Sequence, residues 1–387
     1  MEWVEKKSSE LYVSSSGLSK SSDQFGYGYP FLSYKDVFNN YYAPDKLSTL
    51  VNSTEKDRMK CSVKQGDVFL TRTSETTDEL GMSCVALHDY VNATFNGFTK
   101  RLRPLTDEIE PKYAAYYFRS PYFRSQCISL ASLITRASLN DGMIRRLKIR
   151  YPLNRKVQEK IGEILYTYDT LIENNTKRIR LLEKMAENLY KEWFVRFRFP
   201  GYEKAEMENG LPKGWKVEKL GSLANISTGK CNREDAEEEG TFQLFDRSQE
   251  IKRSSKWIKD CEAIIVPGEG TSFVPRYYVG KFNLHQRCYC IEPLIPKIGK
   301  FLFYTIMFYR KYFLSVATGA TVPSLRHNNF TYMKITLPAK EFYTQFDEVV
   351  SDLFAEKDNL QHQNTLLARQ RDLLLPRLMS GKLEVKP

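Results

Sequence analysis

The longest regular pattern in this sequence is a heptad repeat in the middle of the chain, between Leu153 and Trp193. No glycine or proline lies between Gly162 and Pro200, so the stretch predicts one continuous helix of roughly 50 Å at about 1.5 Å per residue. A helix of that length indicates a spacer between domains, because ordinary globular helices are about a quarter to a third as long. Seam positions, spaced alternately four and three apart, are occupied by Ile161, Leu165, Tyr168, Ile172, Asn175, Ile179, Leu182, Ala186, Leu189 and Trp193.

The region around this helix recurs later in the chain. Ala137-Ser138-Leu139 followed by Lys148-Ile149 matches Pro323-Ser324-Leu325 followed by Lys334-Ile335, at a constant offset of 186 from Ser138 to Ser324. A second heptad helix then follows, with Phe346, Val350, Leu353, Leu360, Asn364, Leu367, Leu374 and Leu378 on its seam. The chain therefore reads as globule, helix, globule, helix.

This repeat predicts an α+β fold in which two strand-rich globular domains are separated and followed by long helices. We expect the helices to pair as an antiparallel coiled coil with pseudo-twofold symmetry. The expected segments are a first domain over 1–152, a helical spacer over 153–200, a second domain over 201–338 and a second spacer over 339–387.

Asn175 and Asn364 occupy equivalent points in the two predicted helices. A lone asparagine on a coiled-coil seam is typical of a device that sets the register; the alternative is an exposed polar residue near a helix bend. The second seam also carries Lys357 and Arg371, which makes it less apolar than the first and better suited to sharing a partner helix than to standing alone.

Composition restricts the function less than the repeat does. The chain carries 58 basic and 47 acidic residues, a formal net charge of +11 and a pI near 9.1, which favours a polyanionic partner or simply solubility. Neither a signal peptide nor an apolar run of membrane-spanning length is visible, so we expect a cytoplasmic protein without membrane contact. The seven cysteines contain no C-x-x-C pair, so we expect reduced thiols and no metal site.

Motifs for catalysis are missing. There is no Asn-Pro-Pro or Asp-Pro-Pro for amino-group methylation, and none of the Gly-Lys pairs has the earlier glycine of a phosphate loop. Pro44-Asp45 with later acidic and lysine residues is a weak match to a Mg²⁺-dependent nuclease, because carboxylates that could bind Mg²⁺ are common by chance. We therefore expect no catalytic residue and no cofactor in this chain.

Three sequence stretches resemble one known family, the specificity subunits of type I restriction-modification systems. They are LYKEWFVRFRFPG from Leu189, LPKGW from Leu211 with LGSLA from Leu220, and RDLLLPRLMSGKL from Arg371. The resemblance covers the whole chain, firmly in the helices and their flanks and loosely in the globules. It implies two target recognition domains, each reading one half of a split, asymmetric DNA site, with the helices acting as a ruler.

The resemblance also implies the partners. These are double-stranded DNA, two modification (methyltransferase) subunits and, in the full complex, two restriction subunits. S-adenosylmethionine, ATP and Mg would then be used by the partner subunits.

For DNA contact we consider basic and polar side chains at strand ends and loops, because arginine pairs with guanine and asparagine or glutamine with adenine, while lysine and hydroxyl groups hold phosphate. In the first domain the candidates are Lys20, Lys35, Arg72, Thr73, Ser74, Lys100, Arg101 and Arg136. In the second domain they are Lys230, Arg233, Arg247, Thr271, Ser272, Arg276, Tyr277, Gln286, Arg287 and Arg326.

Aromatic residues form two further groups. Tyr27, Tyr29, Tyr34, Tyr41 and Tyr42 are suited to stacking on a distorted base, although core and rim packing is the simpler interpretation. The candidates for partner binding are Trp193, Phe194, Phe197 and Phe199 with Leu374 and Leu378. We expect these aromatics to pack near Leu373–Leu378 and to help dock the modification subunit.

Other functions stay open on sequence grounds. One is the recognition chain of a restriction enzyme in which cutting and methylation are merged; another is a stand-alone Mg²⁺-dependent nuclease. A third is a coiled-coil adaptor without a role on DNA, which a steep salt dependence of DNA binding would exclude.

Overall fold

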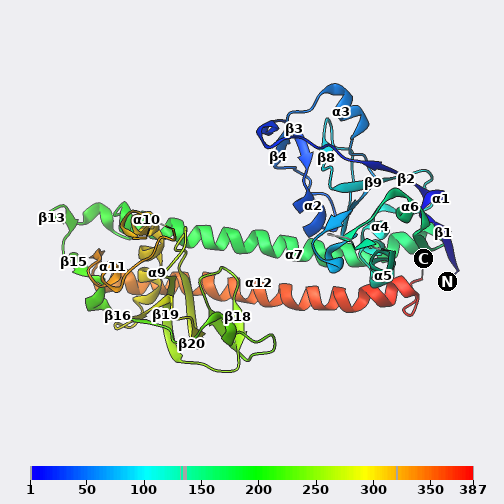
Figure 1. Cartoon of the computed structure of the whole chain (residues 1–387). Helices are drawn as coiled ribbons and strands as arrows, with labels where there is room; N and C mark the ends of the chain where they lie inside the picture. Colours follow the sequence, from blue (N-terminus) through cyan, green and yellow to red (C-terminus); the bar gives the residue numbers. More distant parts are fainter. Residues whose placement is uncertain (1, 131, 134–136, 320, 387) are drawn as a thin grey trace. The chain divides into compact units, whose positions relative to one another are not determined.

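The structure, a computed structural model, describes residues 2–130, 132–133, 137–319 and 321–386 (Figure 1). It divides into two compact units. Unit 1 comprises Met1–Thr176 with His362–Pro387, and unit 2 comprises Lys177–Gln361. Each unit therefore contains one strand-rich domain and one stretch of each long helix, which confirms the predicted mixed fold.

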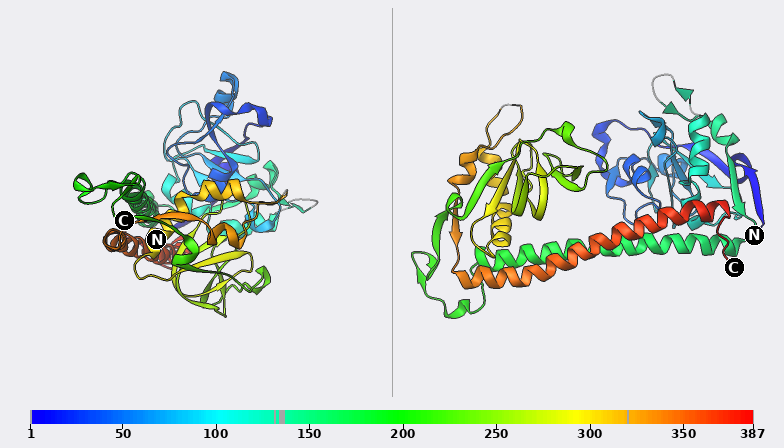
Figure 2. Two further views of the ribbon diagram at one scale, coloured as in Figure 1. Left: turned by 90° about the vertical axis from the view of Figure 1, so that its left-hand side faces the viewer. Right: turned by 90° about the horizontal axis from the view of Figure 1, so that it is seen from below.

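The two long helices are α7 (Arg155–Tyr190) and α12 (Lys340–Ser380), and α7 ends in a π-helical turn at Lys191–Val195. Both helices carry an apolar stripe with charged residues on the outside, as predicted from the heptads. Figure 2 shows α7 in green and α12 in orange to red.

In unit 1 the helix segments are antiparallel. Asp169 pairs with Arg371, and Thr176 accepts a hydrogen bond from Asn364, so residue numbers rise along one helix and fall along the other. Asn175 donates to Gln363 Oε1 at 3.4 Å, and its side chain is buried. The two asparagines thus lie in one polar layer between the helices.

In unit 2 the segments are also antiparallel. Arg178 of α7 pairs with Glu356 of α12 at 2.6 Å, and the ring of Trp193 lies 6.1 Å from that of Phe346. The expected antiparallel pairing of the helices is confirmed within each unit.

Unit 1 is built around a four-stranded sheet of order β2-β9-β5-β7, next to three-stranded sheets β4-β3-β8 and β10-β11-β6 and the pair β1-β12. Its elements are β1 (Trp3–Lys7), α1 (Ser8–Leu11), β2 (Tyr12–Ser16), β3 (Phe25–Leu32), α2 (Tyr34–Asn39), β4 (Thr49–Val51), α3 (Glu55–Lys60), β5 (Val68–Thr71), β6 (Thr73–Ser74), β7 (Ser83–Val85), β8 (Thr94–Phe95), β9 (Thr99–Pro104), α4 (Pro111–Tyr117), α5 (Pro121–Leu130), β10 (Ser132–Leu133), β11 (Ala137–Ser138), α6 (Asp141–Arg146) and β12 (Lys148–Pro152).

The core of unit 1 joins the domain to the helices. Tyr113 and Tyr117 of α4 are buried and donate hydrogen bonds to the carbonyls of Arg150 and Lys148, both at 3.1 Å. The same core contains Ile161 of α7 and Leu378 of α12. Apolar burial of this kind is the main stabilising term of the unit.

Unit 2 is built around a six-stranded sheet of order β16-β21-β19-β20-β17-β18, with the pairs β15-β22 and β13-β14. Its elements are β13 (Met207–Glu208), β14 (Leu211–Pro212), β15 (Lys216–Lys219), α8 (Leu220–Leu223), β16 (Ala224–Thr228), β17 (Phe242–Phe245), β18 (Lys252–Ser254), β19 (Lys259–Pro267), β20 (Arg276–Leu284), β21 (Cys288–Pro293), α9 (Gly299–Phe308), α10 (Arg310–Val316), α11 (His327–Thr331) and β22 (Lys334–Leu337).

The two units repeat one framework. In unit 1, β1 pairs with β12 and the sheet contains the order β2-β9-β5; in unit 2, β15 pairs with β22 and the sheet contains β16-β21-β19. A short helix stands between the first two strands in each unit, α1 in one and α8 in the other. The internal repeat read from the sequence is therefore a repeat of structure.

A glycine after the second strand of each framework allows a close backbone approach. A Cβ at Gly17 would lie 2.2 Å from the carbonyl oxygen of Asn96, and one at Gly229 would lie 1.9 Å from that of Leu284. Real Cβ atoms do not come this close to a backbone oxygen, so only glycine fits at either position. The chain that leaves β2 or β16 is thereby held against a neighbouring loop.

Candidate nucleic-acid interface

In unit 2, the connections that follow β16, β17 and β19 meet the turn between β20 and β21. Lys230 N donates to Leu284 O at 3.1 Å, and Gly268 N donates to Arg287 O at 2.8 Å. The turn is tied to β17 as well, because His285 N donates to the last carbonyl of that strand at 2.9 Å. We call these connections the loop cluster: residues 229–232, 246–250, 268–273 and 285–287.

At the centre of the loop cluster, one carboxylate holds two arginines. Glu269 accepts from Arg247 Nη1 through Oε2 at 2.8 Å and from Arg287 Nη1 through Oε1. The Glu269 side chain is only 14% exposed, whereas those of Arg247 and Arg287 are 49% and 59% exposed. Each guanidinium is thus fixed on one side and open to solvent on the other.

His285 helps to place Arg287. Its Nδ1 accepts from Arg287 N at 3.0 Å. Burial and the neighbouring Arg247 guanidinium lower the pKa of His285, which favours the neutral ring that this hydrogen bond requires.

Arg276 lies beside the loop cluster and is held by backbone oxygens. Its Nη2 donates to Asp246 O at 2.6 Å and its Nη1 to Ser248 O at 3.0 Å, while its guanidinium stacks on the Phe245 ring at 5.0 Å. Its buried Nε has no hydrogen-bond partner. Arg276 therefore fastens the 246–250 connection to β20.

The other candidates of the second domain are placed as follows. Gln286 is in the loop cluster and donates to Asn232 Oδ1 at 2.7 Å. Tyr277 lies apart from it and donates to Glu262 Oε1 at 2.6 Å. Exposed side chains in the cluster or in the adjoining 321–326 segment belong to Lys230, Thr271, Ser272 and Arg326. The side chain of Arg233 lies outside the described part of the structure.

In unit 1 the candidate residues are more buried. Lys100 is 4% exposed and donates to Asp141 Oδ2 at 2.8 Å, and Arg101 is 7% exposed and donates to Ser62 O at 2.6 Å. Burial raises the pKa of Asp141, but hydrogen bonds from Lys100 and Ser14 outweigh it and lower that pKa overall. Both cations are thus engaged inside the domain.

The remaining first-domain candidates lie near the end of β5. Ser74 donates to Glu79 at 2.8 Å, and Thr73 pairs with Ser138 across β6 and β11. Arg72 is half-buried, with a buried Nε that has no partner. Lys20 pairs with Asp57 at 3.0 Å, Lys35 is exposed on α2, and Arg136 lies outside the described residues.

Comparison with known proteins decides the family. The family model of the type I restriction modification DNA specificity domain matches residues 2–184 and again 212–366, which together make up most of the chain. The chain belongs to this family. It is a specificity subunit, the component that recognises DNA sequence, and catalysis in such systems is carried by partner subunits.

Individual relatives agree with this membership. The MjaIX specificity subunit of Methanocaldococcus jannaschii is 25% identical over all of this chain and 94% of its own length. The EcoDI specificity subunit of Escherichia coli is 32% identical over 45% of this chain and 39% of its own length. The S subunit crystal structure from M. genitalium has a TM-score of 0.62 at 16% identity, covering 97% of this chain and 96% of that one, and so shares the fold.

The aromatic residues expected on a docking surface of this specificity subunit are mostly internal. Phe194 and Phe199 are buried in the unit 2 core, where Phe199 lies 5.2 Å from the Trp215 ring. Trp193 and Phe197 are half-buried against the same core. Leu374 and Leu378 instead pack in the core of unit 1, so the expected packing of the aromatics near Leu373–Leu378 is wrong.

The tyrosines considered for base stacking separate into two groups. Tyr41 and Tyr42 pack on Tyr116 of α4, with ring centroids 4.9 and 5.7 Å away, so they belong to the interior of unit 1. Tyr27 and Tyr29 of β3 are exposed, and Arg58 lies 3.8 Å above the Tyr29 ring. Tyr34 is half-buried and donates to Thr73 O at 3.1 Å.

Sequence reasoning missed the acidic members of the loop cluster. Glu269 and Asp246 each hold cations, and Asp246 pairs with Lys252 at 2.6 Å. A choice restricted to basic and amide side chains cannot include them. The sequence does carry one signal for both residues: each is an acidic residue just after a strand, next to a glycine or an arginine.

Two further features are absent from the described ranges. No group of three His, Cys, Asp or Glu side chains is placed to hold a metal ion there. None of the helices described there has an apolar run long enough to cross a membrane.

Proposed function

We propose that this specificity subunit reads a split, asymmetric DNA sequence, with one domain for each half-site. The domains proposed are 1–152 and 201–338, and the helical segments 153–200 and 339–387 would fix the gap between the half-sites. The repeated framework supports this, since two similar folds with different loops suit two different half-sequences. The same helices and the aromatics Trp193, Phe194, Phe197 and Phe199 with Leu374 and Leu378 are proposed to support docking of modification and restriction subunits.

The observation that carries this proposal is the arginine pair on Glu269. Both Arg247 and Arg287 use Nη1 for the carboxylate, which leaves Nη2 and Nε of each guanidinium for another acceptor pair. Guanine offers such a pair in the major groove at O6 and N7. A carboxylate-held arginine loses less side-chain entropy on binding than a free one, so it discriminates bases better.

The first domain presents a different surface. Arg72, Thr73 and Ser74 follow β5 at the place where Gly268 and Glu269 follow β19, and they stay our candidates for its base contacts. Lys20, Lys35 and Arg136 are proposed to help hold phosphate in the same half-site, and the buried Lys100 and Arg101 to support that surface from inside the domain. The chain would carry no cofactor, and S-adenosylmethionine, ATP and Mg would be used by its partner subunits in the cytoplasm.

Methylome sequencing tests the proposal in one measurement. A strain that produces the complete modification complex is compared with one that carries Arg287→Ala, and the modified motif is read in both. We expect a split motif in the first strain. In the variant we expect relaxation at one guanine of one half-site, worth about 1 to 3 kcal/mol of discrimination, while the other half-site and the gap stay unchanged.

The matched control is Lys256→Ala, which removes one exposed positive charge from the same domain outside the loop cluster. It should leave the motif intact. A continuous motif in the unmodified strain, or a change in both half-sites of the Arg287→Ala strain, contradicts the assignment of one domain to each half-site.

A further inference from the structure

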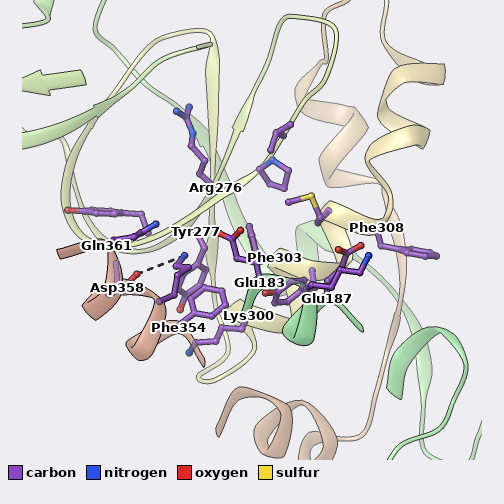
Figure 3. Close-up of a pocket in the computed structure, with 18 of the residues that line it drawn as sticks. Glu183, Glu187, Arg276, Tyr277, Lys300, Phe303, Phe308, Phe354, Asp358 and Gln361 are labelled. Carbon is purple, nitrogen blue, oxygen red and sulfur yellow. Dashed lines mark ion pairs between the residues drawn. The ribbon is translucent and has the colours of Figure 1, made fainter. Parts of the chain in front are cut away.

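Unit 2 contains a large groove beside the loop cluster. It has a volume of about 1470 Å³ and lies between the domain and the two long helices, with all lining residues inside unit 2. Its walls come from α7, α12, β20 and α9 (Figure 3). Pockets for small molecules are usually smaller than this, so the groove suits a macromolecular ligand.

The rim of the groove carries unneutralised positive charge. Arg180 and Lys184 line it from α7, and Arg310 and Lys311 from the start of α10. Within the described ranges none of these four cations forms an ion pair. The acidic side chains of the lining are Glu183, Glu187 and Asp358, and basic residues outnumber them. An anion in the groove would therefore meet positive potential from both walls.

Aromatic rings on the floor are partly covered by further cations. The Lys300 ammonium lies 5.6 Å from the Tyr277 ring centroid and pairs with Asp347, and that of Lys357 lies 4.7 Å from the Phe354 ring and 3.9 Å from Asp358. A cation over a ring is attracted to the face of that ring. Although the floor contains several aromatic rings, these lysines make it less suited to a purely apolar ligand.

Arg276 connects the groove to the loop cluster. It lines the groove, and it is also the residue that donates to the carbonyls of Asp246 and Ser248. Phe245 and Ile251, on either side of that connection, line the groove as well. A DNA duplex held at the loop cluster would therefore have its next phosphates within reach of the groove.

The corresponding place in unit 1 is filled by the protein itself. Tyr41 and Tyr42 occupy it, and Arg371 of α12 is neutralised by Asp169 of α7. A partner protein present in two equivalent copies needs two equivalent surfaces. Because the two units differ in these residues, the groove of unit 2 fits an asymmetric ligand better.

We propose that the groove binds the phosphodiester backbone of the DNA that flanks the half-site read by the second domain. This rests on the proposed function, because the loop cluster must place the duplex. The groove then adds affinity that is independent of base sequence and sensitive to salt. Its cations contact phosphate, and the sequence is still read by Arg247 and Arg287.

The experiment measures how DNA affinity depends on salt for the full chain in complex with its modification subunits. The variant Lys184→Ala/Lys311→Ala removes one cation from each wall, and the probe is a duplex that carries the methylated motif with long flanks. Each lost phosphate contact lowers the slope of log affinity against log salt by about 0.9. We expect a slope smaller by roughly 2, equal losses on specific and unrelated duplexes, and an unchanged motif in methylome sequencing.

The matched control is Lys334→Ala/Lys340→Ala, which removes two exposed charges of unit 2 that do not line the groove. Its slope should stay close to that of the unmodified complex. A duplex trimmed at the end of the second half-site should show the same slope with and without the groove substitutions.

Two outcomes overturn the proposal. One is an unchanged slope in the groove variant while the unmodified complex still binds its motif specifically; this separates failure of the groove from failure of the recognition function, in which specific binding is absent altogether. The other is loss of the modification subunit from the variant with the slope preserved, which assigns the groove to an acidic protein segment.

Discussion

The two units use one framework but treat the junction between domain and helices in opposite ways. In unit 1, Arg371 of α12 reaches Asp169 of α7, which also accepts from Tyr116 of the domain, and Tyr41 stacks beside them. In unit 2, α12 presents Lys357, whose nearest carboxylate is its neighbour Asp358 at 3.9 Å. A polar network closes the first junction; in the second, Lys300 of α9 pairs with Asp347 of α12 at 2.7 Å, and the weakly paired Lys357 lies beside the groove.

The strongest test of this comparison is Arg371→Ala set against Lys357→Ala. The Arg371 side chain is 15% exposed and Asp169 is 20% exposed, so the arginine substitution leaves a carboxylate with little solvent and only Tyr116 as donor. Breaking a buried ion pair from one side costs about 3 to 5 kcal/mol. We expect the free energy of unfolding of unit 1 to fall by that amount, while Lys357→Ala changes that of unit 2 by less than about 1 kcal/mol.

Denaturant unfolding followed by hydrogen exchange of amides in α4 and α9 separates the two units in this measurement. The double variant Arg371→Met/Asp169→Leu is the control, because replacing both charges by apolar groups should recover most of the loss. Equal losses for Arg371→Ala and Lys357→Ala would show that the two junctions do not differ energetically.

The framework itself could be predicted from the sequence, because it depends on periodic patterns. The heptads of α7 and α12 and the repeat from Ser138 to Ser324 are local and regular, and the antiparallel pairing follows once both helices are recognised. The closed and open junctions could not be predicted, since they depend on pairs such as Asp169 with Arg371 that are far apart in sequence. Arg371 could be recognised as a charged seam position, but its partner Asp169 reads as an ordinary charged position on a helix surface.

The recognition site could be predicted in part and for a similar reason. Choosing basic and amide residues at strand ends selected Arg247, Gln286 and Arg287, which the structure brings into one cluster. The same rule selected Lys100 and Arg101, which are buried, because strand-end position does not reveal whether a neighbouring carboxylate or carbonyl takes the charge. Their role on DNA stays a prediction.

Acid should weaken unit 2 through one carboxylate, Asp246. Burial raises the pKa of Asp246, but hydrogen bonds from Lys252 and Ser248 outweigh it and lower that pKa to about 2. Because the folded state favours the ionised carboxyl, its stabilisation is complete above pH 4 and is lost as the pH falls toward 2. Allowing for solvent screening, the loss is about 1 to 2 kcal/mol.

The measurement is thermal unfolding between pH 5 and pH 2 for the unmodified chain, Asp246→Asn and Asp141→Asn. In Asp246→Asn, the unfolding temperature of unit 2 should fall less steeply as the pH is lowered. Asp141→Asn should have a smaller effect on unit 1, because that carboxylate is 53% exposed in its pair with Lys100. A larger effect from Asp141→Asn would reverse the ranking of the two carboxylates.

The smallest expected effect comes from the polar layer between the helix segments of unit 1. Asn364 donates to Thr176 Oγ1 at 3.3 Å, but its buried Oδ1 has no partner, so Asn364→Leu should stabilise unit 1 by about 0.5 to 1 kcal/mol. If the asparagine sets the register, the same substitution should broaden the distance distribution between spin labels on α7 and α12. The control is Asn174→Leu on α7, which changes the exposed asparagine next to the buried Asn175. It should leave that distribution narrow. A narrow distribution in Asn364→Leu would mean that the remaining contacts between the helices fix the register without the asparagine.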